Sequence, residues 1–520
     1  MGGATGSWPR RRFVTALALV SALVPGCGLA EGERFGRAGA PPGTLRIHVQ
    51  APIDDIDPPR ARDGLERAVA LMAFATLLEP DGRPRLARAV TPSADGQRVV
   101  VTLDERARFS DGAPIDADAV LWSWRRALLR STATADLRPF SAIAHGRALA
   151  EGRLLRLART TQGHGAPYAT VGEAPAVDVP SELSAGTMVD IVDSNERRPC
   201  CGRSVPLLRE AGRGEALGAL NHADVGTVIG ARLVDGKRFL LLRSSAGAAG
   251  WAAHELLTVN VPPASLLRVV DRGDASAALR VGPDDDAPLR EQLHDDDVVE
   301  VVGETEGWVQ VVDVRSGHMG FVPRRTLEAM RGEQQWLKVA PVDASNRTTP
   351  TTWLPLRDLA FDPSALGARV VAADTIEVDC ASDVASVLAA LAQPALAPVP
   401  PHTVGAHGRG WTAPATIVTS GPFVPVTVSP ERVTLTKSDR ALERGRVHLE
   451  RAELVVVEDP IAALHLYRAG ELDVLLALPA DLAPKLARAA DWVHGGGLVA
   501  PEVRGLSISS LDLRDVVVTR

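Results

Sequence analysis

The side chains that most often perform catalysis or bind metals are scattered along this chain of 520 residues. His402 and His407 lie five positions apart, and no cysteines or carboxylate cluster near them in sequence could complete a metal site. The acidic runs 284–286 and 295–297 lack the ligand spacing of a calcium loop, which favours solvated turns. The sequence has no phosphate-binding glycine loop and no nucleophile elbow. These patterns predict a protein that is not an enzyme and that uses no cofactor and no metal.

The four cysteines are too few for a disulfide-stapled scaffold. Cys200 and Cys201 are adjacent, an awkward geometry for a mutual disulfide, and Cys380 lies in a predicted strand. Cys27 differs from these three because it ends the segment Leu23–Cys27, which resembles a bacterial lipobox. In a lipobox, the cysteine becomes the lipidated first residue of the mature protein. A plain signal peptide with an incidental cysteine is the alternative.

Residues 1–27 have the order of an export signal. Arg10–Arg12 form a charged region that precedes the apolar stretch Phe13–Val24. That stretch is shorter than the ~20 apolar residues of a transmembrane helix. The arginines and Phe13 also resemble a twin-arginine motif, which leaves the export route open. Residues 28–43 are rich in Gly, Ala and Pro and predict a flexible tether. We therefore expect an exported protein of the cell envelope, lipid-anchored to a membrane on its periplasmic or outer side.

Composition and length predict a globular protein with several domains. Hydrophobic residues make up 45% of the chain and charged residues 23%, which excludes wholesale disorder. The length suggests about three domains. The formal net charge of -7 gives no electrostatic footprint for nucleic acid, so nucleic acid is not an expected partner.

Both flanks of the chain predict mixed helices and strands. Leu45–Gln50 and Arg98–Leu103 have the pattern of strands, and the apolar spacing of Leu65–Leu78 predicts a helix. A second helix is expected over 117–129, with Asp116 as its N-cap. Its side chains expected to face the core are Leu121, Trp122 and Leu128.

The middle of the chain, from about residue 163 to 352, contains an internal repeat of short β-type segments. The clearer second copy includes Ala278–Pro283, Gly307–Val311 and Gly320–Pro323, which resemble the signature of bacterial SH3-like domains. The first copy includes Val205–Arg209 and Phe239–Leu242. We expect two all-β SH3-like barrels, over 163–262 and 263–335. Trp308 and Phe321 are expected in the core of one, and Trp251 in the core of the other.

The two flanks carry a series of ordered motifs. The motifs that fit best are Ile56–Pro58, Leu77–Gly82, Phe109–Ala117, Thr419–Phe423 and Tyr467–Val474. Together they resemble the extracytoplasmic solute-binding lipoproteins of the oligopeptide/dipeptide class (bacterial extracellular solute-binding protein family 5), which feed ABC importers. The resemblance implies a mixed α/β fold over 44–162 and 353–520, with a periplasmic-binding-protein-like lobe and an accessory lobe that holds the two barrels. It also implies capture of peptides or another small solute for an ABC permease.

The resemblance carries two candidate ligand contacts onto this chain. Arg62, Asp63 and Gly64 match the segment that pairs with an extended peptide, main chain to main chain. A solvated turn before the helix is the alternative. Phe140 matches an aromatic near the ligand, and a core phenylalanine is the alternative.

The resemblance also has a limit that bears on function. Leu511–Val518 resembles a segment after which family members continue into a second large lobe. Without that lobe, half of the expected cleft is missing, and residues 28–520 are expected to bind peptides weakly, if at all. Two alternatives stay open: an envelope interaction protein that uses its SH3-like domains to bind cell wall or a protein partner, and a truncated fragment without function.

Overall fold

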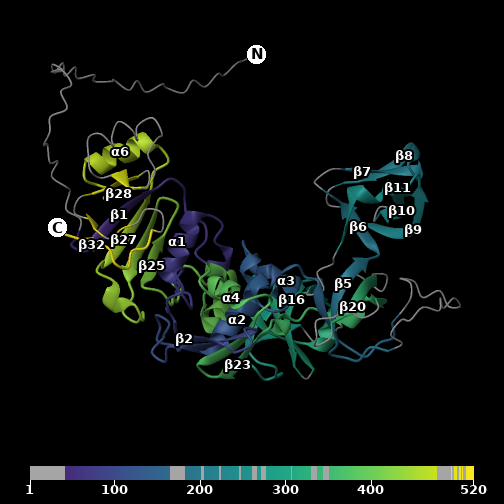
Figure 1. Ribbon diagram of the computed structural model, residues 1–520, viewed down its shortest axis with the longest axis horizontal. Helices are drawn as coiled ribbons and strands as arrows, with labels where there is room; N and C mark the ends of the chain where they lie inside the picture. The colour runs from purple at the N-terminus through teal and green to yellow at the C-terminus, as the bar shows by residue number, and fades with distance from the viewer. Residues whose placement is uncertain are drawn as a thin grey trace, which may run out of the picture.

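The structure is a computed structural model that describes most of the chain from residue 41 onward (Figure 1). The residues outside the described set are 1–40, 164–181, 201–203, 222–223, 245–246, 261–265, 271–276, 306, 330–335, 343–350, 477–492, 495–496, 501–502, 505, 507–510 and 520. The expected export signal with Cys27, most of the tether, and Cys201 therefore lie outside the described residues. No helix in the described part is long and apolar enough to cross a membrane.

One lobe, here the β1 lobe, is built on a seven-stranded sheet of order β25-β26-β27-β1-β28-β30-β29. Its strands are β1 (Thr44–Val49), β25 (Phe423–Val428), β26 (Arg432–Lys437), β27 (Arg451–Val456), β28 (Val474–Leu475), β29 (Val493–His494) and β30 (Gly497–Val499). β1 pairs in parallel with β27, so the two flanks of the chain meet at the centre of this sheet. Leu45, Ile47 and Val49 are buried in its core. Helices α1 (Gly64–Ala73) and α6 (Pro460–Arg468) belong to the same lobe.

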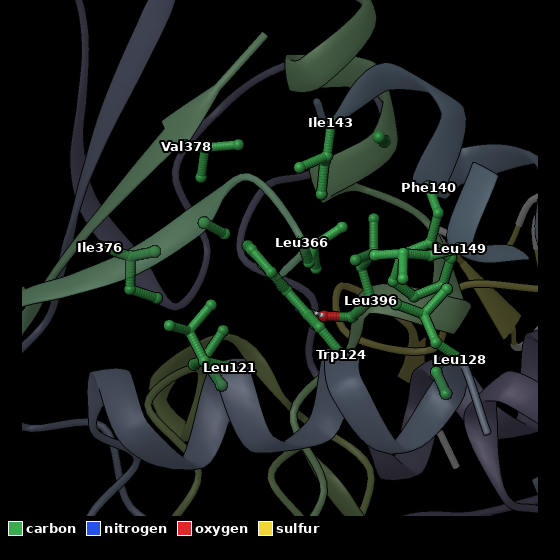
Figure 2. Close-up of a cluster of buried hydrophobic side chains, with 14 of the residues drawn as sticks. Leu121, Trp124, Leu128, Phe140, Ile143, Leu149, Leu366, Ile376, Val378 and Leu396 are labelled. Carbon is green, nitrogen blue, oxygen red and sulfur yellow. Dashed lines mark hydrogen bonds between the residues drawn. The ribbon is translucent and has the colours of Figure 1, made fainter. Parts of the chain in front are cut away.

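A second lobe, here the α2 lobe, surrounds helix α2 (Ala117–Ala127). It contains a four-stranded sheet of β2 (Ala87–Pro92), β3 (Arg98–Leu103), β24 (Thr375–Asp379) and β23 (Ala368–Ala372). Helices α3 (Gly146–Ala150) and α4 (Val384–Leu391) complete it. Figure 2 shows the core, where Trp124 is fully buried and its Nε1 donates to the Leu396 carbonyl at 2.9 Å. Leu121 and Leu128 are buried as expected, but Trp122 is only partly buried, and Trp124 is the central side chain.

The ends of the insert join the α2 lobe through a five-stranded sheet. Its strands, in sheet order, are β21 (Thr352–Pro355), β20 (Trp336–Pro341), β5 (Met188–Ser194), β4 (Leu154–Leu157) and β22 (Leu359–Ala360). Val189, Ile191 and Leu337 lie in the core of the α2 lobe. The strands that leave for the insert and return from it are thus part of this lobe.

The mixed α/β fold expected from the sequence is confirmed, and two helix expectations have different outcomes. Asp116 caps α2 as expected, because its Oδ1 accepts from the Ala119 backbone N–H at 2.8 Å. The helix predicted over Leu65–Leu78 instead ends at Ala73, with Phe74 in an extended conformation. The Ala75 N–H donates to Ser420 Oγ, which directs the following apolar residues away as extended chain. Apolar spacing alone did not reveal this partner.

Two seven-stranded units lie within the insert. The first unit contains β6 (Glu196–Pro199), β7 (Val205–Glu210), β8 (Arg213–Leu220), β9 (Gly226–Val234), β10 (Lys237–Ser244), β11 (Ala249–Ala253) and β12 (Leu257–Val259). The second contains β13 (Leu266–Val269), β14 (Ala278–Arg280), β15 (Leu289–Gln292), β16 (Val298–Thr305), β17 (Trp308–Asp313), β18 (Met319–Pro323) and β19 (Leu327–Ala329). The first sheet has the order β12-β6-β9-β10-β11-β7-β8, and the second has the matching order β19-β13-β16-β17-β18-β14-β15.

The prediction that aromatic side chains form the cores of these two units is wrong. Trp251, Trp308 and Phe321 are each half-buried and belong to neither core. The cores are aliphatic, with Val309, Val311 and Val322 in the second unit, and Leu240 and Leu242 in the first. Because side chains alternate along a strand, these buried residues place the neighbouring aromatic residues on the outer face of each sheet.

Candidate functional site

Arg62, Asp63 and Gly64 form the entrance to α1 and are exposed. Asp63 is the N-cap: its Oδ1 accepts from the N–H groups of Leu65 and Glu66, both at 2.8 Å. The Glu66 carboxylate in turn accepts a hydrogen bond from the Arg62 N–H at 2.7 Å. The segment is therefore a well-ordered helix start whose Gly64 N–H is the first of the orphan donors. Both of the interpretations given above, peptide-pairing edge and solvated turn, fit an exposed and rigid segment.

Phe140 lies elsewhere, in the 3-10 turn Arg138–Ala142. Its side chain is fully buried and belongs to the core of the α2 lobe, whereas α1 packs in the core of the β1 lobe. The structure does not bring Phe140 into one site with Arg62–Gly64. A ligand would contact this ring only after the core had opened, which fits a core phenylalanine.

The motif at Ile56–Pro58 meets helix α2 in a buried ion pair between the lobes. Asp57 accepts from Arg126 Nη1 at 3.0 Å and from Nη2 at 2.5 Å, and both side chains are nearly inaccessible. Trp411 adds a longer contact, from its Nε1 to Asp57 Oδ2 at 3.4 Å. Its ring packs edge-on against Phe74 with centroids 5.5 Å apart. This cluster fixes the turn after β1 against α2.

A cavity of about 270 Å³ lies beside this cluster. One wall comes from the lobes, through the turn after β1, Arg126 and Trp411, and the other comes from the second unit, through Val312, Gly317 and Met319. Asp55 lines the same cavity and pairs with Arg60 at 2.7 Å. Burial raises the pKa of Asp55 above its ordinary value, and the neighbouring Asp57 charge adds to that effect. Because residues of the lobes and of the second unit line the same cavity, the second unit lies directly against the lobes.

The second unit is docked through several kinds of contact. Glu300 on β16 is completely buried and accepts from the backbone N–H groups of Arg130 (2.8 Å) and Ser131 (2.6 Å), just after α2. Val312 and Met319 belong to the core of the α2 lobe rather than to the core of their own unit. Sequence reasoning missed Glu300, because a single glutamate among valines has the pattern of a solvent-facing strand position.

The turn between β17 and β18 completes this docking. The Arg409 N–H donates to the Ser316 carbonyl at 3.0 Å, and Arg409 Nη2 donates to the Val314 carbonyl at 2.8 Å. At Gly317, which has φ of +75°, a Cβ would lie 2.8 Å from the Arg409 backbone nitrogen. The two backbones thus approach as closely as glycine allows.

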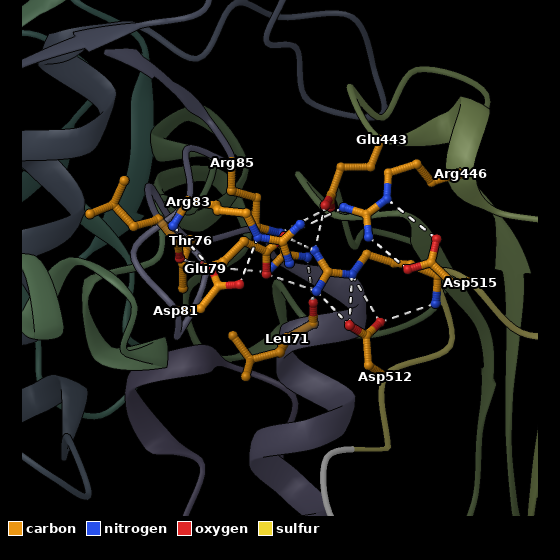
Figure 3. A network of polar contacts seen from close by, with 12 residues as sticks. Leu71, Thr76, Glu79, Asp81, Arg83, Arg85, Glu443, Arg446, Asp512 and Asp515 are labelled. Atoms are coloured by element: carbon orange, nitrogen blue, oxygen red, sulfur yellow. Dashed lines mark hydrogen bonds and ion pairs between the residues drawn. The ribbon is translucent and has the colours of Figure 1, made fainter. Parts of the chain in front are cut away.

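An ion-pair network attaches the C-terminal segment 511–518 to the first flank and to an earlier part of the second flank (Figure 3). Arg514 pairs with Glu79, with Glu443 at 2.6 Å and with Asp512 at 2.5 Å. Arg85 also reaches Glu443, at 3.0 Å. Burial alone would raise the pKa of Asp512, but the hydrogen bonds from Arg514 outweigh it and hold the pKa below its ordinary value. The network joins the motif at 77–82 to the motif at 511–518.

The other chemistry-bearing residues do not assemble into a site. His402 Nε2 lies 2.6 Å from Asp111 Oδ2, a carboxylate that the sequence did not place beside it. Cys380 is buried at the end of β24, where burial raises the pKa of its thiol. Within the described ranges, no three His, Cys, Asp or Glu side chains are grouped as metal ligands.

Comparison with protein families identifies the class to which these lobes are similar. The model of bacterial extracellular solute-binding proteins, family 5 (middle region), matches residues 82–165 and 335–506, which lie on both sides of the insert. The model of the bacterial SH3 domain matches residues 273–328, within the second unit. The matched solute-binding family consists of binding proteins, as its description says.

Individual relatives match over a shorter stretch. The probable deoxycholate-binding periplasmic protein YgiS of Escherichia coli (strain K12) is 30% identical over 128 residues, 24% of this chain and 24% of that protein. The periplasmic oligopeptide-binding protein OppA of Salmonella typhimurium is 27% identical over 125 residues, 24% of this chain and 23% of that protein. The matched part thus spans about a quarter of these relatives. Among solved structures, OppA of Burkholderia pseudomallei has a TM-score of 0.45 at 14% identity, over 90% of this chain and 51% of that chain.

Proposed function

We propose that this chain is a solute-binding protein of the cell envelope that captures peptides or another small solute for an ABC permease. The observation that carries the proposal is the family match on both sides of the insert. The parallel pairing of β1 with β27 supports it, because it joins the two flanks into a single lobe. The proposed location is outside the cytoplasmic membrane, with Cys27 as the lipidated residue. The protein is proposed to act by reversible binding, without catalysis.

We assign ligand pairing to the exposed entrance of α1. An extended peptide would pair there main chain to main chain, which gives affinity without side-chain specificity. The Gly64 N–H is the donor that this mode requires. A proline at the first position of a helix is tolerated, because that N–H has no partner within the helix. Asp63 already has the extended conformation (φ -112°, ψ -179°) that a following proline requires.

Gly64→Pro therefore tests the proposal without breaking the helix. Among the described atoms, none lies within 4 Å of the position that a Cβ at Gly64 would take. Calorimetry against a pool of short peptides should show saturable binding by the parent and about tenfold weaker binding by Gly64→Pro, the loss of one main-chain hydrogen bond at a desolvated edge. Gly64→Ala keeps the N–H and should bind as the parent does. Equal binding by all three chains, or no peptide binding at all, would contradict the proposal.

A further inference from the structure

The two units of the insert differ sharply in charge. Residues 196–259 contain nine basic and six acidic residues, a net charge of +3. Residues 266–329 contain seven basic and fourteen acidic residues, a net charge of -7. Because the two units share one strand order, the fold does not require this difference. The difference points to surfaces that face different surroundings.

The positive charge of the first unit is concentrated on the β9–β10 hairpin. Arg232, Lys237 and Arg238 are exposed, and Leu233 pairs directly with Arg238 and Val234 with Lys237. The structure gives none of the three cations an ion-pair partner among the described residues. Asp235, in the turn, is the one acidic residue of this hairpin. By contrast, Arg209 and Arg213 of the same unit are paired with glutamates.

The hairpin tip also exposes an apolar side chain and closes with a tight turn. Leu233 is 70% exposed, the largest exposed fraction among the large apolar side chains of the described residues. Asp235 and Gly236 both have positive φ, at 50° and 75°, as a tight two-residue hairpin turn requires. Because side chains alternate along a strand, Leu233 and Arg238 share one face of the tip, and Arg232 and Lys237 lie on the other face.

The first unit is also placed so that this tip is accessible. In Figure 1 it stands apart from the lobes, joined to the rest through β5 and β6. Its base is fixed by Asn195, which exchanges hydrogen bonds of 3.1 Å with Trp336. The acidic second unit is seated on the lobes, away from the tip, where its charges do not neutralise the hairpin.

We propose that the β9–β10 hairpin docks onto an anionic phospholipid membrane, with the three cations at the headgroups and Leu233 in the interface. A hairpin tip that carries unpaired cations on both faces and one exposed apolar side chain matches the two components of interfacial binding, electrostatic attraction and apolar burial. The negative second unit would be repelled from the same surface, which fixes the orientation of the docked protein. This proposal is independent of solute binding.

The test uses residues 41–520, which contain all the cores described above and lack the apolar leader. Co-sedimentation should show binding to vesicles that contain phosphatidylglycerol, weaker binding to vesicles of phosphatidylcholine alone, and a loss of binding as salt rises. Arg232→Glu, Lys237→Glu and Arg238→Glu together should weaken binding by about 100-fold or more, about fivefold for each lost cation. Leu233→Ser should weaken binding to a smaller extent and leave its salt dependence unchanged.

A matched triple variant controls for overall charge. Arg83→Glu, Arg106→Glu and Arg138→Glu alter three exposed lobe cations and change the net charge by the same amount. This variant should bind vesicles as the parent does. Equal weakening by both triples, or no preference for phosphatidylglycerol, would overturn the proposal. Binding to soluble polyphosphate without binding to the vesicles would also overturn it, and would assign the hairpin to an anionic polymer.

Discussion

The two seven-stranded units have the same strand order but different relations to the rest of the molecule. Register aligns Thr227, Arg243 and Ala249 of the first unit with Glu300, Val312 and Met319 of the second. In the second unit these three side chains are buried against the α2 lobe, whereas in the first unit Arg243 is exposed and Thr227 and Ala249 are half-buried. One scaffold therefore serves as a seated part of a lobe in one copy and as a projecting module in the other. The outer face of the strands, and not the core, makes the difference.

The largest expected effect comes from the buried glutamate. Glu300→Ala leaves two partly buried N–H groups without an acceptor, at about 1–3 kcal/mol each, and should lower the free energy of unfolding by about 3 kcal/mol. Thr227→Ala, at the aligned position of the first unit, should change it by less than about 0.5 kcal/mol. Urea denaturation of both variants measures the difference. Similar losses of unfolding free energy in the two variants would mean that the contact of Glu300 with the α2 lobe does not stabilise the protein.

A smaller effect is expected at the paired turn glycines. Gly317 and Gly247 both have positive φ, so alanine at either position costs about 1 kcal/mol in backbone strain. At Gly317 the added Cβ also meets the Arg409 backbone, whereas at Gly247 no described atom lies within 4 Å. Gly317→Ala should therefore destabilise by about 2 kcal/mol or more and Gly247→Ala by about 1 kcal/mol. Thermal unfolding distinguishes them, and an equal shift would argue against close contact at the docked turn.

The smallest difference between the two units is expected at the aligned aromatic residues on the outer faces. Trp251 and Phe321 are both half-buried, so truncation of either should cost about 1–2 kcal/mol, less than the 3–5 kcal/mol typical of a fully buried ring. Trp251→Ala and Phe321→Ala are compared by urea denaturation. If either variant lost about 3–5 kcal/mol of unfolding free energy, the result would support the sequence-based prediction that these rings form the cores.

The sequence predicted elements whose determinants are local. The strand expected at Leu45–Gln50 is β1, and Asp116 caps α2 because an N-cap depends on the residues next to it. The end of α1 could not be predicted, since it depends on Ser420, far away in the chain. Strand alternation did not identify the inward face in the two units, because aromatic and aliphatic side chains occupy opposite faces and both are apolar.

The candidate site was predictable in part. Arg62–Gly64 lies at an exposed helix entrance, as the apolar spacing that begins at Leu65 indicated, whereas Phe140 lies in a core. The docking of the second unit was not predictable, because nothing near Glu300 in sequence reveals the N–H groups of residues 130 and 131 that it meets. Contacts of this kind join residues that are distant in sequence, and a single sequence carries no signal for them.

Native-state hydrogen exchange, resolved by peptide, tests the central claim most directly, because it measures the opening free energy of each region in the whole protein. Amides of β16 and β17 should open with the same free energy as those of α2, and Glu300→Ala should lower both together. Amides of β9 and β10 should open at a lower free energy that Glu300→Ala leaves unchanged. The claim is contradicted if the second unit opens separately from α2, with protection like that of the first unit.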